Sequence, residues 1–206
     1  MSKKIIEGEV NLAFLRLKNL PDFLSDVEVD RDFACHDNVM TSLEGAPKVI
    51  KGEFNCSNNQ LKSLEGAPQS VGGDFSCNKN QLKSLKGAPQ SIGGGFSCHR
   101  NQLESLEGAP QSVGGGVNCC LNQLKSLKGA PQSVGTYFDC SMNQLESLQG
   151  CPQTVRGDFD CNKNQLESLQ GCPQTVGGDF DCGDNKVKFT EEQVRAVCKV
   201  KGDVII

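Results

Sequence analysis

A repeat of 21 residues runs through most of this chain and constrains its fold more than any other feature. The unit is easiest to see in DFSC at residues 74–77 and GFSC at residues 95–98. Phenylalanine recurs at this interval, with one valine in the series, at Phe33, Phe54, Phe75, Phe96, Val117, Phe138, Phe159 and Phe180. Cysteine follows two residues later in each copy, at Cys35, Cys56, Cys77, Cys98, Cys119, Cys140, Cys161 and Cys182. Asparagine follows three residues after cysteine, at Asn38, Asn59, Asn80, Asn101, Asn122, Asn143, Asn164 and Asn185. A fixed period this short predicts a solenoid, in which each unit buries its apolar side only against its neighbours.

The spacing within one unit predicts a strand. Phe75 and Cys77 lie two residues apart, so a strand points both toward the core and Ser76 toward solvent. Identical strands then stack in parallel about 4.8 Å apart, and the rest of each unit makes the crossover. The crossover carries Gly-Ala-Pro or Gly-Cys-Pro and few helix formers, so we expect an extended or 3₁₀-like outer side and shallow curvature. The predicted fold class is a mainly β repeat solenoid with a parallel β-sheet on its concave face. Each inward asparagine is expected to bond backbone groups at the turn after the strand.

These residues resemble the leucine-rich repeat family, whose pattern is L-x-x-L-x-L-x-x-N/C-x-L. One unit supplies the second leucine, the third leucine, the asparagine and the fourth leucine of that pattern as Phe75, Cys77, Asn80 and Leu82. At the first leucine the chain has Gly72, and the apolar residue is Val71, one place earlier. The resemblance covers roughly residues 27–190 and is closest to the short, helix-poor repeats of bacterial and phage proteins. It implies a protein-binding scaffold.

Both ends of the chain depart from the repeat and are expected to cap it. Residues 1–26 form the predicted N-terminal cap, residues 27–189 the solenoid and residues 190–206 a C-terminal helix-strand cap. Apolar residues are dense in the first segment, at Ile5, Ile6, Val10, Leu12, Phe14, Leu15, Leu17, Leu20, Phe23 and Leu24. Thr190 and Gln193 match a capping box that opens a short helix, with Val194, Val197 and Cys198 on its apolar side. The terminal apolar strand edge is a pairing risk, so we expect a monomer or a homodimer formed through a cap.

Composition limits the classes of function. The formal net charge is −4 and the Lys/Glu alternation on the crossover is mixed in sign, so we expect no nucleic-acid partner. No apolar stretch reaches membrane-spanning length, and the N-terminus does not resemble a signal peptide. We therefore expect a cytoplasmic protein without a membrane partner, whose twelve cysteines stay reduced. The cysteine columns are interpreted as small core residues rather than a metal ladder, because zinc ligands cluster with spacings such as C-x₂-C. No cofactor is expected.

Positions that point outward from the strands differ between copies, and these differences carry the functional signal. The middle units bring together apolar and aromatic residues with an arginine, the composition of an interface anchor. The predicted anchor residues are His99, Arg100, Cys120, Leu121, Tyr137 and Met142. Gly95 and Gly116 are expected to leave open space beside them. Neutral drift among exposed positions is the alternative interpretation.

The later units collect aspartates on the same face, at Asp139, Asp158, Asp160, Asp179 and Asp181. Like charges on strands about 4.8 Å apart repel one another. A protein partner with a basic surface would offset this repulsion, and we favour it. Calcium is the alternative cation, although calcium sites usually add carbonyl ligands from a preformed loop. A solvated acidic face that aids solubility is the third interpretation.

An enzymatic function is not predicted. His99 and Cys120 share one column on successive units, and a Cys–His pair is nucleophile chemistry in principle. The sequence shows no third group to orient the imidazole and no deep cleft on a shallow sheet. The sequence favours a non-enzymatic protein-binding scaffold that uses its concave face. By analogy with phage and bacterial repeats of this type, the expected role is inhibition of a host defence protein in the bacterial cytoplasm.

Overall fold

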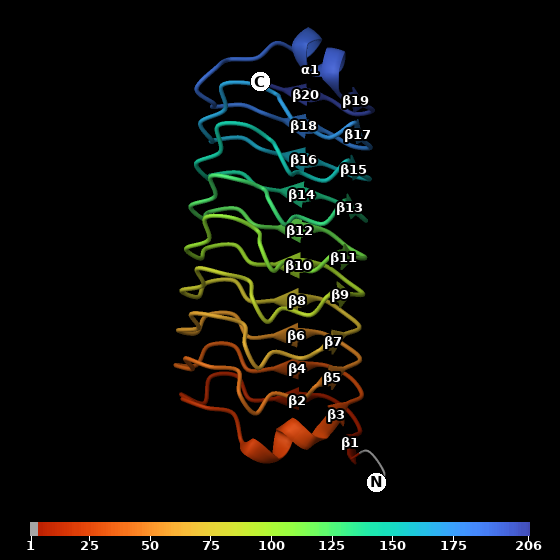
Figure 1. Ribbon diagram of the computed structural model, residues 1–206. Coiled ribbons are helices and arrows are strands. Elements are labelled where there is room, and N and C mark those ends of the chain that lie inside the picture. The colour runs from red at the N-terminus through yellow and green to blue at the C-terminus, as the bar shows by residue number, and fades with distance from the viewer. Residues whose placement is uncertain (1–3) are drawn as a thin grey trace.

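The computed structural model describes residues 4–206 and shows them wound into a stack of similar turns (Figure 1). Within this part of the chain the turns build two parallel sheets of ten strands each, which we call sheet A and sheet B. Sheet A contains β1 (Lys4–Ile6), β3 (Val27–Val29), β5 (Val49–Ile50), β7 (Ser70–Val71), β9 (Ser91–Ile92), β11 (Ser112–Val113), β13 (Ser133–Val134), β15 (Thr154–Val155), β17 (Thr175–Val176) and β19 (Lys199–Val200). Sheet B contains β2 (Val10–Asn11), β4 (Phe33–Ala34), β6 (Phe54–Asn55), β8 (Phe75–Ser76), β10 (Phe96–Ser97), β12 (Val117–Asn118), β14 (Phe138–Asp139), β16 (Phe159–Asp160), β18 (Phe180–Asp181) and β20 (Val204–Ile205). The predicted fold class is confirmed, and the stack is close to straight in this view.

The strands of sheet B are those predicted from the phenylalanine–cysteine pair, whereas sheet A was not predicted. The strands of sheet A contain the apolar residue that precedes the double glycine, such as Val71, which is buried. The following Gly72 lets stacked backbones approach closely, because a Cβ atom there would lie 2.1 Å from the carbonyl oxygen of Lys51. In several turns a glycine at the place of the first leucine therefore lies between the two strands, and Lys51 and Arg156 take this position in two others.

The core lies between the sheets and the returning outer side. The phenylalanine, cysteine and leucine columns are buried almost without exception, with Phe75, Cys77, Leu82 and Leu85 all at 0% exposure. Ring centroids of successive phenylalanines lie 5.1–5.9 Å apart. Burying each such side chain contributes roughly 1.5–3 kcal/mol. The outer side is extended with a tight turn, where Gly87 has a φ of +95° that a side chain would strain.

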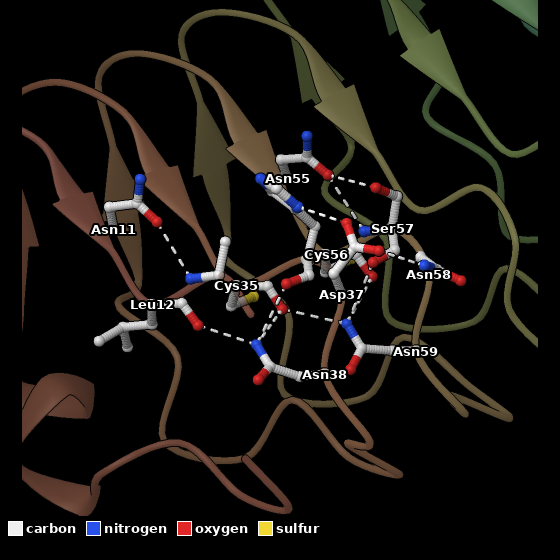
Figure 2. Close-up of polar contacts among 12 residues, drawn as sticks. Asn11, Leu12, Cys35, Asp37, Asn38, Asn55, Cys56, Ser57, Asn58 and Asn59 are labelled. Carbon is white, nitrogen blue, oxygen red and sulfur yellow. Dashed lines mark hydrogen bonds and ion pairs between the residues drawn. The ribbon is translucent and has the colours of Figure 1, made fainter. Parts of the chain in front are cut away.

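The asparagine column joins each turn to the one before it (Figure 2). Asn59 donates through Nδ2 to the carbonyl oxygen of Cys35 in the preceding turn at 3.0 Å and to that of Cys56 at 3.2 Å. Its Oδ1 accepts from the backbone N–H of Met40 at 3.0 Å. Equivalent bonds recur up to Asn185. The expectation that asparagine serves the backbone at this turn is confirmed, and each amide satisfies groups that are costly to leave unpaired in the core.

Short helices lie at the two ends of the stack (Figure 1). The 3₁₀-helix η1 (Asp22–Asp26) buries Leu24 near the N-terminus. The helix α1 (Glu191–Val197) begins at the predicted capping box, in which Thr190 and Gln193 bond each other's backbone N–H. Val194 and Cys198 are buried as predicted. Val197 is 54% exposed, so its assignment to the apolar side was wrong.

Candidate interaction surface

The outward side of sheet B, together with the residues just before and just after its strands, forms the surface that we call the ladder face. Strand alternation places the phenylalanines and cysteines inward and the residues between them outward. Register is strict: Asn118, Asp139, Asp160 and Asp181 lie opposite one another on β12, β14, β16 and β18. All residues predicted as partner-binding belong to this face.

Tyr137 lies across the ladder face rather than pointing away from it. A Cβ atom added to Gly116 in the preceding turn would lie 2.4 Å from Cε1 of the Tyr137 ring. The ring therefore rests on the backbone of Gly116, which is buried, while the side chain of Tyr137 stays 44% exposed. The open space expected at Gly116 is thus filled by the ring. Partial burial, followed by the charge of Asp139, raises the pKa of the phenol above its usual value.

The second residue after each cysteine adopts a left-handed backbone conformation in every repeat. The column has φ between +51° and +54° and contains Asp37, Asn58, Lys79, Arg100, Leu121, Met142, Lys163 and Asp184. Asparagine and aspartate tolerate this region, whereas other side chains adopt it at a cost on the order of 1 kcal/mol. Leu121 and Met142 are also exposed, at 37% and 40%. Two apolar side chains therefore stand on adjacent turns where neither backbone preference nor burial favours them.

His99 and Cys120 lie at the N-terminal side of this apolar group. The two ring nitrogens of His99 contact Ser97 Oγ at 2.9 Å and Asn78 Nδ2 at 3.3 Å. Burial and the neighbouring Arg100 lower the pKa of the imidazole. Burial, followed by the charge of Asp139, raises the pKa of the Cys120 thiol to about 12. A protonated thiol and an imidazole bonded elsewhere do not make an activated nucleophile.

Three of the five aspartates form a ladder of their own on β14, β16 and β18. In each, Oδ1 accepts the backbone N–H two residues later: Asp139 from Ser141 at 3.0 Å, Asp160 from Asn162 at 2.9 Å and Asp181 from Gly183 at 2.9 Å. These bonds fix the carboxylates in register. Burial, together with the charges of Asp139 and Asp181 on either side, raises the pKa of Asp160 to about 6, although the N–H of Asn162 acts to lower it.

Asp158 and Asp179 have a different structural role, although the sequence analysis grouped them with the other three aspartates. Each precedes its phenylalanine and reaches the next turn, where Asp158 Oδ1 accepts the N–H of Asp179 at 2.9 Å. Asp179 Oδ1 accepts the N–H of Asp203 at 2.8 Å. Asp32 and Asp74 make the same bond in earlier turns. This column therefore ties turns together, and only one carboxylate oxygen of each is used for it.

The ladder face thus combines an apolar centre with an acidic C-terminal half. No group of three or more His, Cys, Asp or Glu side chains within residues 4–206 is arranged to hold a metal ion. No helix in the same part of the chain is long and apolar enough to cross a membrane. What the sequence reasoning missed is the left-handed column, because its residues share no type that would reveal a common conformation.

Comparison with known proteins places the fold. The two stacked sheets, the buried asparagine column and the short period give the chain a solenoid fold similar to that of leucine-rich repeat domains. Among solved structures, a Shigella effector leucine-rich repeat domain is similar, with a TM-score of 0.57 and 19% identity over 95% of this chain and 81% of that chain. YopM from Yersinia enterocolitica WA-314 aligns with a TM-score of 0.45 and 20% identity, over 86% of this chain and 47% of that one. No family model matches the sequence, and no curated protein matches it.

Proposed function

We propose that this chain is a non-enzymatic scaffold that binds a protein partner on its ladder face. The observation that carries the proposal is the pair Leu121 and Met142, apolar, exposed and held at left-handed backbone angles. The left-handed backbone at these two residues lowers the stability of the fold, and burial in the core does not offset this cost. We therefore infer that the two side chains serve in binding. The ring of Tyr137 beside them is a rigid aromatic group of the kind that anchors interfaces.

The three aspartates in register on β14, β16 and β18 indicate the charge that the partner should carry. Asp139, Asp160 and Asp181 stand in register, and the raised pKa of Asp160 means that its charge is poorly compensated in the free protein. A basic protein surface would relieve this repulsion and steer the encounter. Arg100 and His99 lie on the opposite side of the apolar centre, so the partner is expected to present a basic area beside an apolar one, in a fixed direction along the stack.

The biological role that we propose follows from a binding function without catalysis. A scaffold of this kind, encoded by a bacterium or a phage, would act by covering the surface of a host protein, such as a defence factor. The free thiols of all twelve cysteines suit a reducing bacterial cytoplasm.

The test begins with capture from bacterial lysate by the wild-type protein and by a Tyr137→Ala, Met142→Ala double variant. Val187→Ala, at an exposed apolar position outside the ladder face, is the matched control. A partner that the wild type and the control retain and the double variant loses would be taken forward to binding kinetics. Equal capture by all three proteins, with their folds intact by circular dichroism, would remove the ladder face from the proposal.

A further inference from the structure

The C-terminal end of sheet A is closed by a side chain. In most earlier turns the carbonyl oxygen of the last strand residue accepts an N–H from the next turn, as that of Ile50 does from Gly72 at 2.9 Å. At the last turn the guanidinium of Arg195 takes this place, with Nη1 2.9 Å from the oxygen of Val200 and Nη2 3.0 Å from that of Gly202. Helix α1 thereby ends the sheet with the hydrogen bonds that a further turn would have made.

The N-terminal end is built differently. β1 and β2 are the edge strands of the two sheets, and large apolar side chains gather in the same turn. Ile5 is 51% exposed, Phe14 71%, Leu15 56% and Phe23 68%. Only part of the apolar set expected to fill an N-terminal cap is therefore buried. A polar outer face is what a capping turn needs for solubility, so this end has the character of an interface.

Leu15 shows that this end is matched to an apolar neighbour. It stands where every later turn has the buried asparagine, and its own N–H donates to Asn38 Oδ1 at 3.1 Å. The asparagine of the next turn, Asn38, donates to the carbonyl oxygen of Leu12 in the preceding turn at 2.8 Å and to that of Cys35 in its own turn at 3.0 Å. Any small polar residue would suit water at the first turn, yet the chain places a leucine there. Beside it, Phe14 has a φ of +61° and contacts His36 only by its ring edge.

Exposed charges of both signs occur at this end, including Lys4, Glu7 and Glu9 on and between β1 and β2. Arg16 and Lys18 are exposed on the loop that follows β2, and Asp22 and Asp26 are exposed on η1. A two-fold rotation that sets one end against its copy can place the basic loop of each protomer against the acidic helix of the other. In that arrangement the two surfaces would be complementary, as an isologous interface requires.

We propose that two copies of this chain bind each other through their N-terminal ends in a closed two-fold dimer. The exposed β2 edges pair antiparallel, and Phe14, Leu15 and Phe23 of both protomers form the apolar centre. Because a two-fold contact uses the N-terminal end of each chain once, the assembly formed through this end closes at two copies. The residues of the proposed partner site, from His99 to Asp181, belong to later turns than β2, Phe14 and Leu15, so the dimer is independent of that site.

The experiment is sedimentation velocity on the full chain at concentrations from about 1 to 100 µM, the range in which dimers of moderate affinity dissociate. The wild type is expected to sediment as a dimer. Phe14→Ser combined with Leu15→Asn should raise the dimer dissociation constant by at least about 100-fold, as removal of central apolar anchors does. Ile205→Ser, at a half-exposed isoleucine of the C-terminal edge, is the matched control and should leave the dimer unchanged.

A second variant guards against misfolding of the first. Phe23→Asp changes one exposed side chain on η1, and it should also dissociate the dimer while the circular dichroism spectrum stays that of the folded chain. A monomeric wild type throughout the range, a dimer that survives both N-terminal variants, or dissociation by Ile205→Ser would each overturn the proposal. Tyr137→Ala should not affect sedimentation, so failure of the ladder-face proposal and failure of this one are told apart.

Discussion

The ring of Tyr137 occupies the space that a side chain on Gly116 would need. Tyr137 is the single tyrosine of the chain and there is no tryptophan, so intrinsic fluorescence reports on this contact alone. We predict that Gly116→Ala lifts the ring into solvent and increases acrylamide quenching of its emission, while the fold is retained. Gly95→Ala is the control, because the atoms nearest its added Cβ belong to Gly116 and Asp74. Equal quenching in the wild type and Gly116→Ala would mean that the ring does not rest on Gly116 in solution.

The left-handed column gives a prediction in which stability and binding change in opposite directions. Leu121→Asn should raise the free energy of unfolding by about 0.5–1 kcal/mol, because asparagine tolerates a positive φ, and should weaken partner binding. Lys163→Asn occupies the same column outside the anchor group. It should gain similar stability without loss of affinity. Urea denaturation and surface plasmon resonance measure the two quantities, and a Leu121→Asn variant that binds like wild type would contradict the assignment.

Asp160 should make stability depend on pH. Its folded-state pKa of about 6 lies above the ordinary value of 3.8, so the protonated carboxyl is the form that folding favours. Stability from this group is complete below about pH 3.8 and is lost as the pH rises through about 6. Asp160→Asn should therefore be more stable than the wild type at about pH 7.5, and the difference should disappear on acidification. Thermal melts across this range measure it; a difference independent of pH would argue against a raised pKa. Glu44→Gln, at an exposed acid away from the ladder, is the control.

The asparagine column should be costly to break. Asn101 donates to the carbonyl oxygens of Cys77 and Cys98 and accepts from the N–H of Leu82. Asn101→Leu leaves these buried groups unpaired and should lower the free energy of unfolding by about 2–5 kcal/mol. The neighbouring Gln102 is only partly buried, and Gln102→Ala should change the free energy of unfolding by no more than about 0.5 kcal/mol. Similar losses in the two variants would refute the role given to the amide.

The inward residues were predictable because each column repeats one residue type under one constraint. Phe75, Cys77 and Asn80 stand for eight equivalent positions, and their spacing fixes which side of the strand they occupy. Sheet A escaped prediction since a strand of two residues such as Ser70–Val71 shows no alternation, and the adjacent glycines favour a bend. The split among the aspartates escaped it too. Asp158 and Asp160 differ only in whether the carboxylate reaches the next turn or its own, which depends on three-dimensional register.

The strict register of the turns has a consequence for how such a surface changes over generations. Residues 158–178 begin with the same four letters, DFDC, as the unit that follows them, so loss of this block would join matching sequences and leave the asparagine bonds intact. The remaining acidic turns would move toward Tyr137 by one step of about 4.8 Å, with no new core to design. The surface can therefore change in two independent ways. Single substitutions alter the side chain at one turn, and duplication or loss of whole units alters the distance between two turns.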